Sequence, residues 1–202
     1  MSIEYVREIP SREDIVKKLP LTEKVKQIKN KRDEELKKIL EGKDNRFIVV
    51  VGPCSADRED AVMEYMNRLS KVEKKLKDKL YIIPRIYTNK PRTNGEGYKG
   101  MLHQPDVEKK PNLVDGIKAI RRLHLRVLQE TGMTSADEML YPENFVYLSD
   151  LIGYNALGAR SVENQQHRLV ASRSRNASRN EKPYKWRYKY YVKCCKCSTK
   201  IA

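Results

Sequence analysis

The sequence has little cysteine, and most of it lies at one end. Of four cysteines, only Cys54 stands outside residues 173–202, where Cys194, Cys195 and Cys197 crowd together. Cysteines repeated at regular spacing would indicate a disulfide framework, and this distribution indicates none. We therefore expect a reducing, cytoplasmic setting.

Long apolar runs are also missing. No uncharged stretch approaches the roughly 20 residues that a membrane-spanning helix needs. Residues 1–14 mix charges with a proline and lack the apolar centre of a signal peptide. We expect no membrane partner and no secretory leader. The hydrophobic content of 39% is still sufficient for a core.

The positive charge is unevenly distributed. The formal net charge is +15, but residues 173–202 hold ten of the 42 Lys and Arg residues and one acid, Glu181. A large positive charge usually suggests a nucleic acid or an anionic surface as partner. Here the excess belongs mainly to the tail. The remaining balance of 32 basic and 26 acidic residues is ordinary for an enzyme of anionic metabolites.

Hydrophobic patterning predicts alternating strands and helices. Residues 47–51 form an uninterrupted apolar run, as in a parallel strand buried on both faces. The predicted strands are 47–51, 80–87, 134–140 and 155–160, and the predicted helices are 21–41, 57–78, 112–131, 142–152 and 162–171. Four such repeats require parallel strands with right-handed crossovers. A doubly wound sheet and a (β/α)₈ barrel both begin this way, and each places chemistry at the carboxyl ends of strands.

Cations gather after the second predicted strand. Arg85 lies near the end of that strand, and Lys90, Arg92 and Lys99 lie in the long loop 88–111 that follows it. Scattered cations are usually solvated, but Arg85 stands among apolar residues in a strand, where an unpaired charge is costly to bury. It therefore needs an anion. Arginine grips phosphate or carboxylate through two hydrogen bonds and lysine acts as a point charge, so the mixture suits a substrate that bears both groups.

Other strand ends carry weaker signals. Arg160 follows Gly158 and Ala159, two small residues that would let a ligand approach backbone N–H groups. A surface arginine at a helix N-terminus is an equally good interpretation. Glu138 ends the third strand. Cys54 follows the first strand, where a lone cysteine is more often a small buried hydrophobe than a metal ligand.

The three histidines do not indicate a general base. His124 lies among arginines on a predicted helix, and we expect it to be exposed. His103 falls in the long loop and His167 in the last predicted helix.

Several of these phrases, kept in order and spacing, resemble one enzyme family. They are Val51-Gly52-Pro53-Cys54-Ser55, Arg85-Ile86-Tyr87 with Lys90-Pro91-Arg92-Thr93, Tyr98-Lys99-Gly100, Glu138, and Gly158-Ala159-Arg160-Ser161 leading to Glu163-Asn164-Gln165-Gln166-His167-Arg168. Over residues 5–172 the chain is similar to class I 3-deoxy-D-arabino-heptulosonate 7-phosphate (DAHP) synthases. The Lys-Pro-Arg-Thr phrase is the most specific of these motifs.

The resemblance implies a (β/α)₈ barrel enzyme that condenses phosphoenolpyruvate with erythrose 4-phosphate and releases phosphate, at the start of the shikimate pathway to aromatic amino acids. It implies that Arg85 and Lys90 are catalytic, and that they hold phosphoenolpyruvate together with Arg160 and the Gly158-Ala159 backbone. It also implies that Arg92 and Thr93 hold the phosphate of erythrose 4-phosphate, with Pro91 in the same substrate site, that Glu138 lies near phosphoenolpyruvate, and that Cys54 is one ligand of a divalent metal.

The same resemblance divides the chain into three parts. Residues 1–45 correspond to an extension used for subunit contacts and for feedback by an aromatic amino acid, so the intact enzyme is expected to be a homo-oligomer. Residues 46–172 correspond to the first half of the barrel. We expect residues 173–202 to be a disordered, non-native tail.

The family pattern breaks after Ser172. There the family continues with a glycine and a strand reading roughly Pro-Val-Gly-x-Lys-Asn. If one extra base entered near codon 173, the shifted frame can read GVEMPVGMKNPTNGDINIMLNAVNAAQ, which places the family's lysine at the position of Glu181. We therefore interpret the tail as a frameshifted translation. A (β/α)₈ barrel needs about 250 residues, so we expect no bound metal and no synthase activity from this chain.

Two alternative functions assign a binding role to the tail or to the N-terminal extension. Tyrosines and Trp186 alternate with Lys and Arg in the tail, a composition suited to single-stranded nucleic acid. Such binding would be non-specific at this charge. Alternatively, residues 1–45 could pair the chain with intact synthase subunits.

Overall fold

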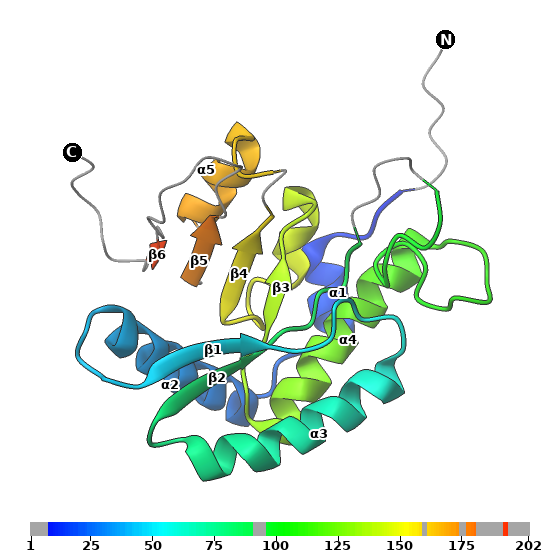
Figure 1. Ribbon diagram of the computed structural model, residues 1–202. Helices are drawn as coiled ribbons and strands as arrows, with labels where there is room; N and C mark the ends of the chain where they lie inside the picture. Colours follow the sequence, from blue (N-terminus) through cyan, green and yellow to red (C-terminus); the bar gives the residue numbers. More distant parts are fainter. Residues whose placement is uncertain (1–7, 91–95, 159–160, 174–176, 181–191, 194–202) are drawn as a thin grey trace.

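The computed structural model of the chain describes residues 8–90, 96–158, 161–173, 177–180 and 192–193 (Figure 1). Strands and helices alternate, as the hydrophobic pattern predicts. The elements in order are α1 (Arg12–Lys18), α2 (Glu23–Leu40), β1 (Phe47–Val51), α3 (Glu59–Leu76), β2 (Leu80–Pro84), α4 (Leu113–Thr131), β3 (Ala136–Glu138), the 3₁₀ helix η1 (Pro142–Tyr147), β4 (Tyr154–Leu157), α5 (Gln165–Arg173), β5 (Ala177–Asn180) and β6 (Val192–Lys193).

The strands are arranged in the order of the sequence. β1 pairs with β2 in parallel, and β3, β4 and β5 form a second parallel set that β6 joins in the antiparallel sense. A single bridge between Arg85 and Ala136 connects the two sets. The order from β1 to β5 therefore lacks the reversal that defines a doubly wound sheet. This parallel α/β architecture confirms the fold class at that level.

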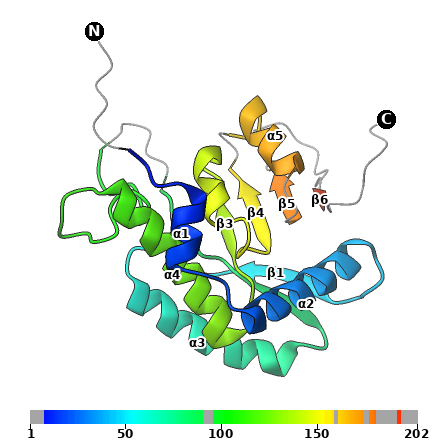
Figure 2. The same ribbon diagram turned by 180° about the vertical axis from the view of Figure 1, so that it is seen from behind.

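Helix α4 supplies much of the core. Asn112 caps its first turn by accepting a hydrogen bond from the backbone N–H of Asp115, and Gly132 ends it in the left-handed conformation at φ 72°. Its buried face includes Ile117, Ile120 and Leu123, which belong to the main hydrophobic cluster. Helix α3 packs against both α4 and β2 (Figure 2). No helix in the described ranges is long and apolar enough to span a bilayer.

Helix α2 is attached to the sheet through Arg32. One terminal nitrogen of its guanidinium donates to the carbonyl of Ile82 over 2.8 Å, and the other pairs with Glu73 at 3.0 Å. Tyr81 donates its hydroxyl to the Arg32 carbonyl over 2.7 Å, and the guanidinium lies 4.0 Å from the Tyr81 ring centre. The predicted helix 21–41 therefore exists; it contacts β2 and α3 through Arg32 and packs against α4.

Some predicted elements differ in type or extent. The helix expected at 142–152 is a 3₁₀ turn over 142–147 that begins at Pro142, and the following residues form turns. Sequence periodicity also missed α1, which Ser11 caps by accepting a hydrogen bond from the N–H of Asp14. Strand β1 covers residues 47–51 as predicted, whereas β2, β3 and β4 are shorter than the predicted strands 80–87, 134–140 and 155–160.

The structure describes a few residues of the tail, and the disorder of residues 173–202 stays a prediction. Arg173 ends α5, β5 lies parallel to β4, and β6 pairs with β5. The remaining residues of 173–202 lie outside the described ranges. An unpaired edge on β4 would leave N–H and C=O groups without partners, so backbone pairing there is favourable whatever side chains follow. The frameshift remains a prediction.

Candidate functional site

Residues selected from the sequence meet at the carboxyl ends of neighbouring strands. Cys54 lies shortly after β1, Arg85 directly follows β2, Glu138 is the last residue of β3, and Gly158 directly follows β4. Val51 pairs with Pro84, Arg85 bridges to Ala136, and Glu138 pairs with Ala156. Parallel pairing therefore brings these positions to one edge of the sheet.

Arg85 is held by backbone groups and an aromatic ring. Its backbone N–H donates to the Val51 carbonyl, and one guanidinium N–H donates to the Pro53 carbonyl, each over 2.9 Å. The guanidinium carbon lies 3.9 Å from the centre of the Tyr87 ring. Within the described ranges no Asp or Glu forms an ion pair with Arg85, although the side chain is half-buried. Its positive charge is therefore oriented but not neutralised by a carboxylate.

The close approach of β1 to Arg85 requires glycine at position 52. A Cβ atom there would lie 2.1 Å from the Arg85 carbonyl oxygen, far inside van der Waals contact. Any larger residue would push the end of β1 away from the end of β2. The Gly-Pro turn before Cys54 is thus part of the geometry that orients Arg85.

The loop after β2 folds back onto its own start. Gly100 has φ 98°, and a Cβ atom there would lie 2.5 Å from the Thr88 carbonyl oxygen. The backbone N–H of Lys90 donates to the Lys99 carbonyl over 3.1 Å. Lys90 is half-buried beside this crossing. The predicted substrate ligands Pro91, Arg92, Thr93, Ala159 and Arg160 lie outside the described residues.

The carboxylate of Glu138 lies against Gly158. A Cβ atom on Gly158 would come within 2.3 Å of Glu138 Oε1. The absence of a side chain at position 158 therefore leaves room for this carboxylate at the junction of β3 and β4. The structure brings Glu138 and Gly158 together, as their places on successive strand ends predict.

Asp137 is a structural residue that sequence reasoning missed. Its carboxylate accepts hydrogen bonds from the backbone N–H of Thr88 at 3.0 Å, from the Thr88 hydroxyl at 2.6 Å and from the backbone N–H of Glu138 at 2.7 Å. It therefore ties the loop after β2 to the end of β3. Strand alternation was the available signal, because it places Asp137 and Glu138 on opposite faces.

The expectation that His124 is exposed was wrong. The side chain is 1% exposed, its Nδ1 lies 2.7 Å from the Ser135 hydroxyl, and its Nε2 lies 3.3 Å from Asp137. Its charged neighbours on α4 point elsewhere: Arg122 and Arg126 both pair with Glu59. A helix charged at i−2 and i+2 can still bury residue i on its apolar face.

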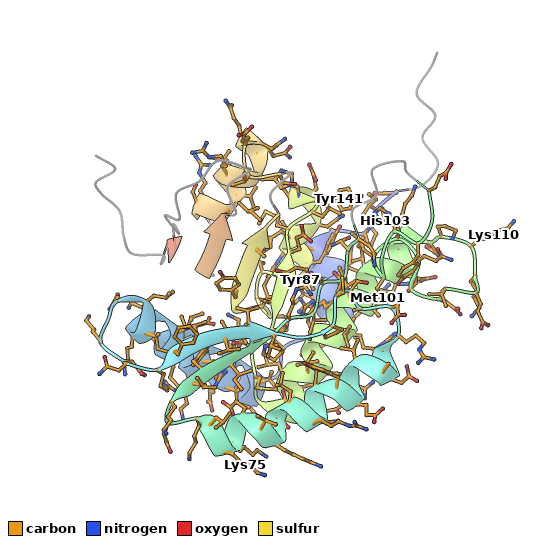
Figure 3. The ribbon with its side chains drawn as sticks, in the orientation of Figure 1. Lys75, Tyr87, Met101, His103, Lys110 and Tyr141 are labelled. Atoms are coloured by element: carbon orange, nitrogen blue, oxygen red, sulfur yellow. The ribbon has the colours of Figure 1, made fainter. Side chains whose placement is uncertain are left out.

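The other histidines have structural partners or surroundings. His103 packs edge-on against Tyr141 with ring centres 5.2 Å apart, and burial, assisted by the charge of Lys99, lowers its pKa. His167 lies 3.0 Å from the Leu140 carbonyl through Nε2. Figure 3 shows His103 and Tyr141 on the same side of the molecule as Tyr87, far from Lys75 on α3.

The described residues do not fit a metal centre. Cys54 is an exposed free cysteine. Nowhere in the described part of the chain do three or more His, Cys, Asp or Glu side chains gather so that they could hold a metal ion. A protein metal site ordinarily needs at least three such ligands, so we derive no chemical step from a metal here.

Comparison with known proteins agrees with this arrangement. The model of the DAHP synthetase I family matches residues 21–177. The chain belongs to the DAHP synthetase I family. The match covers both the extension helix α2 and every described strand up to the start of β5, so the family assignment made from the motifs is confirmed.

The individual relatives are named as phospho-2-dehydro-3-deoxyheptonate aldolases. The Phe-sensitive phospho-2-dehydro-3-deoxyheptonate aldolase of Escherichia coli K12 is 36% identical over 172 residues, which are 85% of this chain and 49% of the relative. The Trp-sensitive enzyme of the same strain is 39% identical over 137 residues, 68% of this chain and 39% of the relative. The comparisons do not support either alternative function.

A solved structure extends the likeness to three dimensions. The phospho-2-dehydro-3-deoxyheptonate aldolase from Francisella tularensis SCHU S4 superimposes with a TM-score of 0.82 at 33% identity. The superposition covers 88% of this chain and 51% of that enzyme. This DAHP synthetase I family member thus spans about half the length of the relatives that it matches.

Proposed function

We propose that the chain forms the first half of a (β/α)₈ barrel of the DAHP synthase type and binds phosphoenolpyruvate at its strand ends. The observation that carries the proposal is Arg85, which is oriented by Pro53 and Tyr87 yet paired with no described carboxylate. The sequential strand order supports the barrel, since strands of a (β/α)₈ barrel follow one another around the axis.

Phosphoenolpyruvate carries a phosphate and a carboxylate, and the site offers two kinds of cation. The planar guanidinium of Arg85 can donate two parallel hydrogen bonds to one anionic group, while Lys90 acts as a point charge on the other. Glu138, whose carboxylate lies against Gly158 at the junction of β3 and β4, is proposed to lie near the bound phosphoenolpyruvate. Arg160 and the Ala159 backbone are proposed as further ligands of phosphoenolpyruvate.

The remaining assignments are proposals based on the family. Arg92 and Thr93 would bind the phosphate of erythrose 4-phosphate, and Pro91 would be part of the substrate site. Residues 1–45 would carry subunit contacts and the response to an aromatic amino acid in a cytoplasmic homo-oligomer. DAHP synthases are metal-dependent, and Cys54 would supply one ligand. Because one thiolate cannot hold a catalytic ion, we expect the 202-residue chain to bind phosphoenolpyruvate without turning it over.

Calorimetric titration of the purified chain with phosphoenolpyruvate tests the proposal. We expect saturable binding that Arg85→Ala and Lys90→Ala each weaken at least about tenfold, as expected for loss of a charge-assisted contact. Lys79→Ala is the matched control, because Lys79 is exposed at the opposite end of β2. Binding lost equally in the control, or absent from a folded wild-type chain, would contradict the proposal. Formation of DAHP from phosphoenolpyruvate and erythrose 4-phosphate would contradict our expectation that the chain is inactive.

A further inference from the structure

A small cavity lies behind the strand ends, on the face of the sheet that packs against helices. Its walls include Asn89 after β2, Asn155 on β4, and the apolar side chains of Ile120 on α4 and Leu148 after η1. Its volume is about 20 Å³. A cavity of about 10–15 Å³ on this measure already holds one water molecule.

Three polar side-chain atoms that line this cavity have no hydrogen-bond partner among the described residues. Two of them are the amide nitrogen and oxygen of Asn155, a residue that is only 1% exposed. The side-chain oxygen of Asn89, a residue 7% exposed, is also buried without a partner. Leaving three buried polar atoms unsatisfied is costly, and native proteins rarely do so.

We propose that this cavity binds one internal water molecule, which bridges Asn155 and Asn89. The Asn155 amide N–H₂ would donate to the water, and the water would donate to the side-chain oxygens of both asparagines. A water in this position makes three hydrogen bonds, the usual number for an internal water. It would connect β4 to the loop after β2, where the described side chains of Asn155 and Asn89 share no direct hydrogen bond.

The chemistry of the lining favours water over a cation. A cation would satisfy the two amide oxygens but would leave the Asn155 N–H₂ group without an acceptor. Water both donates and accepts, so it satisfies all three atoms. Asp137 also lines the cavity, but its carboxylate already accepts hydrogen bonds from Thr88 and Glu138.

The direct test is a water–protein NMR experiment on the isotopically labelled chain 1–202. We expect a rotating-frame Overhauser cross-peak between the water resonance and the Asn155 side-chain N–H₂, of opposite sign to the diagonal, which separates proximity from proton exchange. Resolved Asn155 N–H₂ signals without this cross-peak would overturn the proposal. A shift of these signals that titrates with NaCl or KCl would also overturn it, because it would identify a cation.

The substitution Asn155→Leu gives a second test, because the proposal predicts whether it raises or lowers the unfolding equilibrium constant. If water bridges the two asparagines, Asn155→Leu displaces the water and leaves the buried Asn89 side-chain oxygen without a hydrogen-bond partner. We then expect the unfolding equilibrium constant to rise about tenfold. If the Asn155 atoms are truly unsatisfied, the same change removes a buried penalty, fills the cavity and lowers that constant. The lower constant would overturn the proposal.

Thr134→Val is the matched control. The Thr134 hydroxyl is also buried, lies near the Tyr81 hydroxyl and makes no hydrogen bond of good geometry among the described residues, and Thr134 does not line the cavity. We expect this variant to be neutral or more stable, since it removes an unsatisfied hydroxyl at constant shape. In a double-mutant cycle, Asn89→Leu and Asn155→Leu should be non-additive, because each alone already disrupts the bridge. Additive effects of the two changes would argue against a shared water.

Discussion

Arg121 and Asp150 form a two-point ion pair that joins helix α4 to the turn after η1. The guanidinium of Arg121 is fully buried, and its two terminal nitrogens lie 2.7 and 2.9 Å from the Asp150 carboxylate oxygens. The same guanidinium donates to the carbonyls of Tyr147 and Leu19. One cation thus connects α4, η1 and the segment that links α1 to α2.

Removing Asp150 should strongly destabilise the fold. In Asp150→Ala the Arg121 cation stays buried without its counter-charge, and we expect a loss of about 3–5 kcal/mol in the free energy of unfolding. Urea denaturation followed by circular dichroism measures this loss. Glu64→Ala is the control, because it breaks only the exposed pair with Arg68 and should cost about 0.5 kcal/mol or less. Equal losses in the two variants would show that the buried pair has no special role.

The same pair predicts an acid-dependent loss of stability. Burial alone would raise the pKa of Asp150, but the hydrogen bonds and charge of Arg121 outweigh it and hold the pKa below its ordinary value. A carboxyl with a lowered pKa in the folded state contributes stability above its unfolded pKa, near 3.9, and loses it as the pH falls through the folded pKa. The difference in unfolding free energy between wild type and Asp150→Asn should therefore be constant near neutral pH and shrink below about pH 4. A difference that persists unchanged to pH 2 would refute this assignment.

Adding one methyl group to two strand-end glycines should have very different effects. In Gly52→Ala the new Cβ meets the backbone carbonyl of Arg85, which cannot move without separating β1 from β2. In Gly158→Ala it meets only the end of the flexible Glu138 side chain. We expect Gly52→Ala to cost at least about 2 kcal/mol of stability and Gly158→Ala clearly less. Thermal unfolding of both variants measures these losses of stability. A larger loss of stability in Gly158→Ala than in Gly52→Ala would contradict this prediction.

The first strand should promote aggregation. In the described part of the chain β1 pairs only with β2, and Phe47 at its start is 70% exposed. A charged residue on an open strand edge opposes pairing with another chain. We expect Phe47→Lys to increase the fraction of chain that stays in the supernatant after ultracentrifugation. Val72→Lys, an exposed position on helix α3, should have a smaller effect. An equal gain in both variants would point to net charge rather than to the strand edge.

The sequence predicted the parallel α/β fold because the apolar run 47–51 and the helical periodicity of 112–131 are local signals. The motifs that begin at Arg85 and Gly158 directly follow β2 and β4, although the sequence predicted that these strands would continue to residues 87 and 160. Local signals failed where a residue's surroundings come from elsewhere in the chain. His124 seemed exposed because its sequence neighbours are arginines, but its spatial neighbours are Ser135 and Asp137.

Family membership was determined by the sequence itself, since motifs such as Gly52-Pro53-Cys54 and Lys90-Pro91-Arg92 keep their spacing whatever the chain does in space. Only the tertiary structure decided how the site is supported. The carboxylate of Asp137 reaches Thr88 across 49 residues of sequence, and Asn155 on β4 and Asn89 in the loop after β2 line one cavity. Such contacts depend on strand pairing and helix packing, and no local pattern of side chains encodes which distant backbone group a buried carboxylate or amide will face.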